Sequence, residues 1–234
     1  MIDRKPYTSL PAYERDWLKA RHHIAVVMQQ PGVPDRWGAL RAWNDDEIAP
    51  HSGFPPHPHA NMEIITYVRE GVITHRDSLG NEGQTHAGDV QVMSAGTGIR
   101  HSEYNLQDTA ALVFQIWIDP DRHGGAPAWG TKPFPKVDRA GELVTLASGY
   151  EQDLDAALPI RARARVLGAL LRQGEALEYA LQADRMSYLV ATRGRLLVNG
   201  VRLEARDGAA IRNVSNIALE ALVDAEVVLV DVSP

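Results

Sequence analysis

The chain has 234 residues, 24 Lys and Arg against 30 Asp and Glu, a net charge of −6, and no cysteine. These totals exclude disulfides, thiolate metal sites and a catalytic thiol, and no basic stripe indicates a nucleic-acid partner. No stretch approaches the ~20 apolar residues of a membrane helix, and no apolar run follows the first residues as in a secretory signal. We therefore expect a cytoplasmic protein with no membrane partner.

The length allows either one large domain or two domains of about 115 residues each. Apolar residues make up 44% of the chain, which is enough to fill a core of that size. The fold should not need a metal ion to hold it together. Any metal site in this chain is therefore expected to be functional rather than structural.

Short runs rich in Val, Ile, Leu and Tyr, separated by Gly, Asn and Asp, recur along the chain and predict strands. In chain order the clearest are Met62–Val68, Asp89–Met93, Leu112–Ile118, Met186–Ala191, Arg195–Val198 and Glu226–Val232. Asn199-Gly200 predicts a two-residue hairpin turn, because both turn positions need positive φ. Short strands at this spacing are typical of an all-β sandwich or barrel.

The chain divides into two halves that resemble each other. Residues 119–142 are rich in proline and glycine and interrupt the strand pattern, as a linker does. Before the linker, a strand leads into a turn at Gly71, and a hairpin then leads to a second turn at Gly88. After the linker, Gly194 corresponds to Gly71 and Gly208 corresponds to Gly88. We expect two tandem antiparallel barrels, at residues 1–122 and 144–234, joined by a linker at 123–143.

Two pairs of residues carry the clearest chemistry. His57 and His59 flank one proline, and His101 and Glu103 flank one serine. In a strand, residues i and i+2 point to the same face, so each pair can offer two ligands to one metal ion. Three imidazoles and a carboxylate suit iron, nickel, manganese or zinc, and they leave a coordination position open for a ligand.

Glu63 is an alternative to Glu103. It has the same strand parity as His57 and His59, so it can also be expected to face inward. Residue patterns do not choose between the two glutamates, and the one that is not a ligand can act as a general base or support the ligands.

No histidine lies beyond residue 123, so histidine chemistry is confined to the first half. Outside the two pairs, the simplest interpretation assigns histidines to the surface, to loops or to the core. The surface or loop group is His22, His23, His51 and His123, and the possible core group is His75 and His86.

The motifs around these pairs resemble the two conserved motifs of the cupins. More narrowly, HPHANMEIITYVREG from His57, AGDVQVMSAGTGIRHSEYN from Ala87 and QIWI from Gln115 resemble the pirins, in particular the short bacterial pirin-like quercetinases. The resemblance spans nearly the whole chain and is densest between residues 40 and 118. It implies a fold of two tandem cupin barrels, a bicupin.

The resemblance also implies a ligand set, an activity and a cofactor. The pirin ligands correspond to His57, His59, His101 and Glu103, which makes Glu63 a neighbour of the site. The implied activity is a dioxygenase that opens the central ring of flavonols such as quercetin with O₂, with Glu103 or Glu63 as proton acceptor. Iron(II) is the expected ion, with nickel, manganese, zinc, cobalt and copper as alternatives. Other pirins bind and regulate proteins, so a regulatory protein without turnover is the second hypothesis.

Two regions depart from the pattern. Residues 21–31 read RHHIAVVMQQP where close bacterial relatives are expected to carry aromatic residues, which predicts a different ligand preference if this segment lines the pocket. In the second half, alignment of Gly194 on Gly71 places Ala180 and Gln182 at the positions of His57 and His59. The second barrel is therefore expected to lack the metal site.

Overall fold

The computed structural model describes residues 1–25, 35–133, 141–182 and 184–234. Within these ranges the helical segments are two 3₁₀ turns, η1 (Tyr7–Ser9) and η2 (Glu151–Asp153). Almost every other ordered segment is a strand, so the predicted all-β class is confirmed. No helix in the described ranges is long and apolar enough to cross a membrane.

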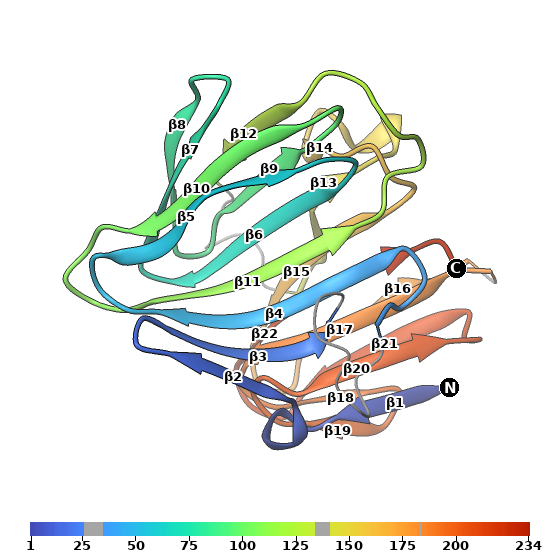
Figure 1. Cartoon of the computed structure of the whole chain (residues 1–234). Helices are drawn as coiled ribbons and strands as arrows, with labels where there is room; N and C mark the ends of the chain where they lie inside the picture. The colour runs from blue at the N-terminus through green and yellow to red at the C-terminus, as the bar shows by residue number, and fades with distance from the viewer. Residues whose placement is uncertain (26–34, 134–140, 183) are drawn as a thin grey trace.

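The first half forms one large and one small antiparallel sheet (Figure 1). The large sheet has the strand order β12-β9-β6-β11-β4-β3-β2, and the small sheet has the order β5-β10-β7-β8. The strands are β2 (Ala12–Arg15), β3 (Leu18–Ile24), β4 (Leu40–Ile48), β5 (Ser52–His59), β6 (Glu63–Glu70), β7 (Val72–Asp77), β8 (Glu82–His86), β9 (Val90–Ser94), β10 (Ile99–Asn105), β11 (Ala111–Ile118) and β12 (Ala128–Lys132).

The second half repeats this arrangement. Its large sheet has the order β1-β20-β17-β22-β15-β13-β14, and its small sheet has the order β16-β21-β18-β19. The strands are β1 (Ile2–Lys5), β13 (Val144–Ser148), β14 (Leu158–Pro159), β15 (Arg165–Leu171), β16 (Ala176–Ala180), β17 (Met186–Arg193), β18 (Leu196–Val198), β19 (Val201–Leu203), β20 (Gly208–Arg212), β21 (Asn216–Ala221) and β22 (Ala225–Val232). The central strands β9-β6-β11-β4 correspond to β20-β17-β22-β15, so the predicted pair of cupin barrels is confirmed.

The turns after the central strands explain the glycine repeat. Gly71 and Gly194 have φ of 79° and 76°, in the left-handed region that favours glycine. A Cβ at Gly194 would also lie 2.1 Å from the carbonyl oxygen of Asp224. The Asn199-Gly200 turn has positive φ at both residues and joins β18 to β19, as predicted.

Two edge strands do not follow the predicted division of the chain. β1, at the N-terminus, pairs with β20 of the second large sheet. β12, inside the predicted linker, pairs with β9 of the first large sheet. Strand patterns in the sequence do not reveal which sheet edge a short strand will join, because that choice depends on contacts between distant segments. The domain boundaries at residues 122 and 143 stay predictions, and residues 134–140 of the linker lie outside the described ranges.

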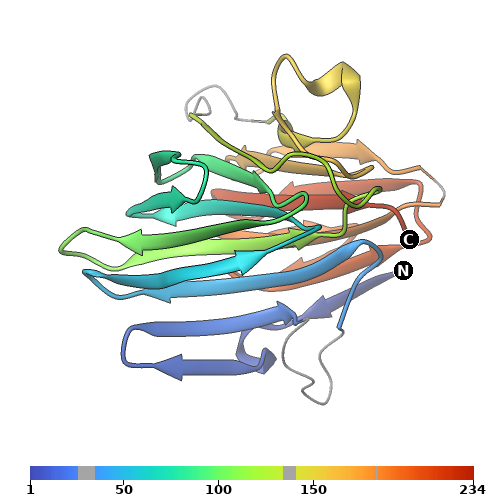
Figure 2. The same ribbon diagram turned by 45° about the horizontal axis from the view of Figure 1, so that its top comes forward.

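A core lies between the two large sheets, which face each other (Figure 2). It includes Trp43 and Phe114 from the first half and Tyr188 and Val230 from the second, each at most 1% exposed. Because both faces of this sheet are covered, β6 is buried at six consecutive positions, from Glu63 to Val68, rather than at alternate ones.

The expectation that His22 and His23 are surface residues is wrong. The last three residues of β3, from His22 to Ile24, are all buried, and the side chains of His22 and His23 are 9% and 1% exposed. Nδ1 of His22 lies 2.8 Å from Asn44 Oδ1, and Nδ1 of His23 lies 3.1 Å from the hydroxyl of Tyr188 in the second half. The rest of the predicted pocket-lining segment, from residue 26 to 31, lies outside the described residues.

Candidate metal centre

The two histidine-bearing strands lie side by side in the small sheet of the first half. β5 pairs with β10, and His57 is directly opposite His101. Between His101 and Glu103 the register shifts, so that two residues of β5, Pro55 and Pro56, oppose one residue of β10, Ser102. The extra residue falls in Pro55-Pro56, where proline is tolerated because a bulge leaves a backbone group unpaired. This β-bulge places the ligand-bearing ends of both strands together.

Three imidazoles converge at this point. The ring centroids of His57 and His101 are 4.5 Å apart, those of His57 and His59 are 4.8 Å apart, and those of His59 and His101 are 5.1 Å apart. One potential ligand atom from each of the three lies within 4.8 Å of the others. The edge of Trp117, on β11, packs against the His59 ring at 5.0 Å.

The protonation of these rings suits metal binding. Nδ1 of His57 lies 2.8 Å from the carbonyl oxygen of Pro55, and because a carbonyl only accepts, Nδ1 carries the proton and Nε2 keeps its lone pair. Burial, with the neighbouring imidazoles, lowers the pKa of His59 to about 4 and that of His101 to about 3. These two rings are thus neutral near pH 7, the form that binds metals.

Glu103 is oriented by three hydrogen bonds from the inner face of the large sheet. Oε1 accepts from Thr66 Oγ1 at 2.8 Å and from Gln91 Nε2 at 2.5 Å, and Oε2 accepts from Gln115 Nε2 at 2.6 Å. The donors come from β6, β9 and β11, so three strands determine the direction of one carboxylate. Such donors fix the orientation of a carboxylate that would ligate a metal.

His57, His59, His101 and Glu103 line one cavity of about 60 Å³, together with Asn44, Asp46, Phe54, Ile64, Gln115 and Trp117. Glu63 is not among the residues that line it. Its Oε2 instead accepts a hydrogen bond of 2.5 Å from Ser94, and burial raises its pKa. Glu63 does not continue the strand parity of His57 and His59, because β5 ends at His59, and Asn61, with φ of 50°, turns the chain before β6 begins.

His75, expected only as a possible core residue, lies both in the core and beside the site. It lies on β7 directly opposite Glu103 and is fully buried. Its ring stacks on Trp129 at 4.7 Å, and its Nε2 lies 3.1 Å from Asp77 Oδ2. His75, His101 and Glu103 also offer ligand atoms within 4.8 Å of one another. The i, i+2 spacing of His75 and Asp77 on β7 was a usable signal, because residues at this spacing in a strand share a face.

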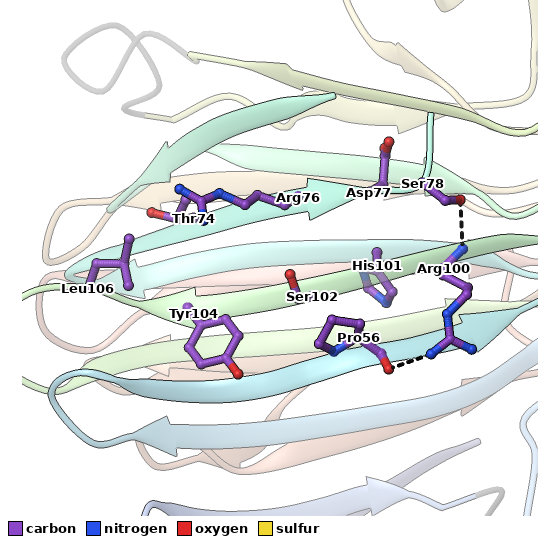
Figure 3. Close-up of a pocket in the computed structure, with 10 residues that line it drawn as sticks. All are labelled: Pro56, Thr74, Arg76, Asp77, Ser78, Arg100, His101, Ser102, Tyr104 and Leu106. Carbon is purple, nitrogen blue, oxygen red and sulfur yellow. Dashed lines mark hydrogen bonds between the residues drawn. The ribbon is translucent and has the colours of Figure 1, made fainter. Parts of the chain in front are cut away.

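Two of the larger hollows border β5 and β10 outside this cavity. One, of about 500 Å³, borders His59 and is lined by residues from both strand ends, including Ala60, Gly98 and Arg100. The other, of about 600 Å³, lies over β7 and β10 and is lined by residues such as Tyr104 and Leu106 (Figure 3). Arg100 borders both, and its guanidinium donates to the carbonyl oxygen of Pro56 at 3.0 Å (Figure 3).

The residues present fit a divalent metal ion. Both ring nitrogens of His101 are buried and have no hydrogen-bond partner among the described residues, which is costly unless a ligand occupies the site. Three imidazoles beside a carboxylate match the donor preferences of first-row transition metals. Both candidate metal clusters in the described ranges lie in the first barrel. The fold and the site together define a bicupin with one candidate metal centre.

The chain belongs to the pirin family. The pirin family model matches residues 8–118, and the model of the quercetinase C-terminal cupin domain matches residues 145–232. The chain is 62% identical over 231 residues to a pirin-like protein of Caulobacter vibrioides, with 99% of each covered. It is 39% identical over 219 residues to the quercetin 2,3-dioxygenase of Escherichia coli K12, with 93% of each covered.

A solved structure supports the same relationship. The bacterial pirin YhhW of Escherichia coli, in complex with nickel(II), is 34% identical to this chain and superposes with a TM-score of 0.92, with 100% of both chains covered. A Pseudomonas aeruginosa protein whose name gives it provisionally as a quercetin 2,3-dioxygenase is 58% identical over 233 residues, with 100% of each chain covered.

Proposed function

We propose that this chain is a metal-dependent dioxygenase that opens the central ring of a flavonol such as quercetin with O₂. The convergence of three imidazoles on the cavity that Glu103 also lines is the observation that carries this proposal. The names of the relatives supply the reaction class. His57, His59, His101 and Glu103 are the proposed ligands, and the ion is iron(II), nickel or another first-row divalent metal.

When bound, the metal would lower the pKa of a coordinated hydroxyl group, as metals do for bound water. Glu103 is the proposed proton acceptor, because its carboxylate faces the same cavity. Thr66, Gln91 and Gln115 hold that carboxylate in one orientation. Phe54, Ile64 and Trp117 form an apolar wall that limits access of water.

The substrate is proposed to lie mostly outside the metal cavity. A cavity of about 60 Å³ is far smaller than the ~300–1,000 Å³ of typical small-molecule sites. The hollow of about 500 Å³ beside His59 is large enough. A flat flavonol could lie there and direct its hydroxyl and carbonyl oxygens past His59 toward the open coordination position.

The test is metal analysis of the purified chain, followed by O₂ uptake with a small panel of flavonols. Loaded wild type should consume O₂ and yield the ring-opened product, and removal of the metal should abolish turnover. His59→Ala should lower turnover by more than about 100-fold, since even residues that only orient ligands are worth about 10- to 100-fold.

The matched control is His51→Ala, because His51 is exposed and bonds only to the exposed Asp108 among the described residues. This variant should keep full turnover. Metal-free protein with full turnover would disprove the proposal. Loaded protein that consumes no O₂ with any flavonol, but captures a specific protein, would favour the regulatory hypothesis instead.

A further inference from the structure

A second carboxyl group lines the metal cavity, and the proposed function does not use it. Asp46 lies on β4, where it pairs with Val113 of β11, and its side chain is 1% exposed. It borders the same cavity of about 60 Å³ as His57 and Glu103. Both of its carboxyl oxygens are buried and have no hydrogen-bond partner among the described residues.

An unpartnered buried acid is destabilising in a folded protein. A polar group removed from water without a hydrogen bond costs about 1–3 kcal/mol, and a charged group costs more. Its neighbours on the inner face do have partners: Asn44 bonds His22, and Gln115 bonds Glu103. Within the described residues, no hydrogen bond offsets the burial of the Asp46 carboxyl group, which points to a function in the cavity it borders.

Burial and neighbouring charges also act on the carboxyl group of Asp46. Burial, followed by the negative charges of Asp45 and Glu103, raises the pKa of Asp46 well above its usual range, and Arg69 only partly opposes this effect. A protonated carboxyl group has one O–H donor and one free acceptor oxygen. It can thus pair with either a donor or an acceptor atom.

We propose that Asp46 is a ligand-binding residue of the metal cavity, whose carboxyl group would form a hydrogen bond to a small ligand held there by the metal ion. This inference rests on the metal-binding part of the proposed function. It places Asp46 and Glu103 in different roles within one cavity. Glu103 has its oxygens held by three protein donors, whereas Asp46 has both oxygens available for the ligand.

The experiment compares wild type, Asp46→Asn and Asp46→Leu as full-length chains loaded with cobalt(II), with azide as the probe ligand. Azide binding is followed by the change in the cobalt absorption spectrum, and cobalt affinity is measured separately. Asp46→Leu should weaken azide binding by about 10-fold or more, the effect of losing a hydrogen bond to a charged ligand. Asp46→Asn, which retains N–H donors, should stay close to wild type, and cobalt affinity should change little in either variant.

Thermal unfolding of the metal-free variants provides a second readout. Asp46→Leu should raise the melting temperature, because it replaces an unpartnered polar group with an apolar one. Unchanged azide affinity in Asp46→Leu would overturn the inference, and so would a loss of cobalt affinity as large as the loss of azide affinity, which would make Asp46 a metal ligand. Wild type that binds no divalent ion would instead overturn the proposed function, so the two failures are distinguishable.

Discussion

At the scale of single residues, the site depends on the side chains that hold Glu103 as much as on the histidines. Gln115 donates to Oε2 of Glu103 at 2.6 Å. Gln115→Leu should lower metal affinity by about 10- to 100-fold, because the carboxylate then loses its fixed direction and an oxygen loses its donor. Competition with a chelator measures this change. Gln84→Leu changes an exposed residue of β8 and is the control, which should bind metal like wild type. If Gln115→Leu bound metal as tightly as Gln84→Leu, the orientation of Glu103 would not contribute to metal affinity.

At the scale of elements, the pairing of β5 with β10 positions both ligand pairs. A Cβ at Gly53 would lie 2.2 Å from the carbonyl oxygen of Glu103 and 2.6 Å from Tyr104 Cα, and both are backbone atoms of β10. Gly53→Ala should therefore push the strands apart, with a loss of about 1–3 kcal/mol of unfolding free energy and weaker metal binding. Denaturant unfolding and metal titration test both effects.

Gly130→Ala on β12 is the control, because its Cβ would meet only Leu158, at 3.6 Å. The unfolding free energy of this variant should stay within about 0.5 kcal/mol of wild type.

At the scale of the whole molecule, the contact between the two barrels should be sensitive to acid through His23. The ring lies against Tyr188 of the second half, and burial, helped by Arg206 and Arg69, lowers its pKa to about 3. The unfolded chain binds a proton near pH 6.5 that the folded chain does not bind until about pH 3, so stability falls as the pH drops through this window. Between pH 7 and 5 the unfolding free energy of wild type should fall about 2 kcal/mol more than that of His23→Gln.

Unfolding curves at the two pH values measure this difference. His51→Gln changes an exposed histidine and should follow wild type. Equal acid sensitivity in wild type and His23→Gln would show that His23 is not held neutral at the contact between the barrels.

The sequence by itself determined the strand-rich class, the repeat and the two ligand pairs. These features depend on local geometry: side chains at i and i+2 share a face, and residues such as Gly71 and Gly194 mark turns wherever the strands lie. Only the tertiary structure decided that Glu103 and not Glu63 borders the cavity, because the turn at Asn61 breaks the strand parity. It also decided that His75 and Asp46 lie beside the site and that β1 joins the second sheet. Those outcomes come from contacts between strands far apart in the chain, and such contacts leave no periodic pattern in the residues that make them.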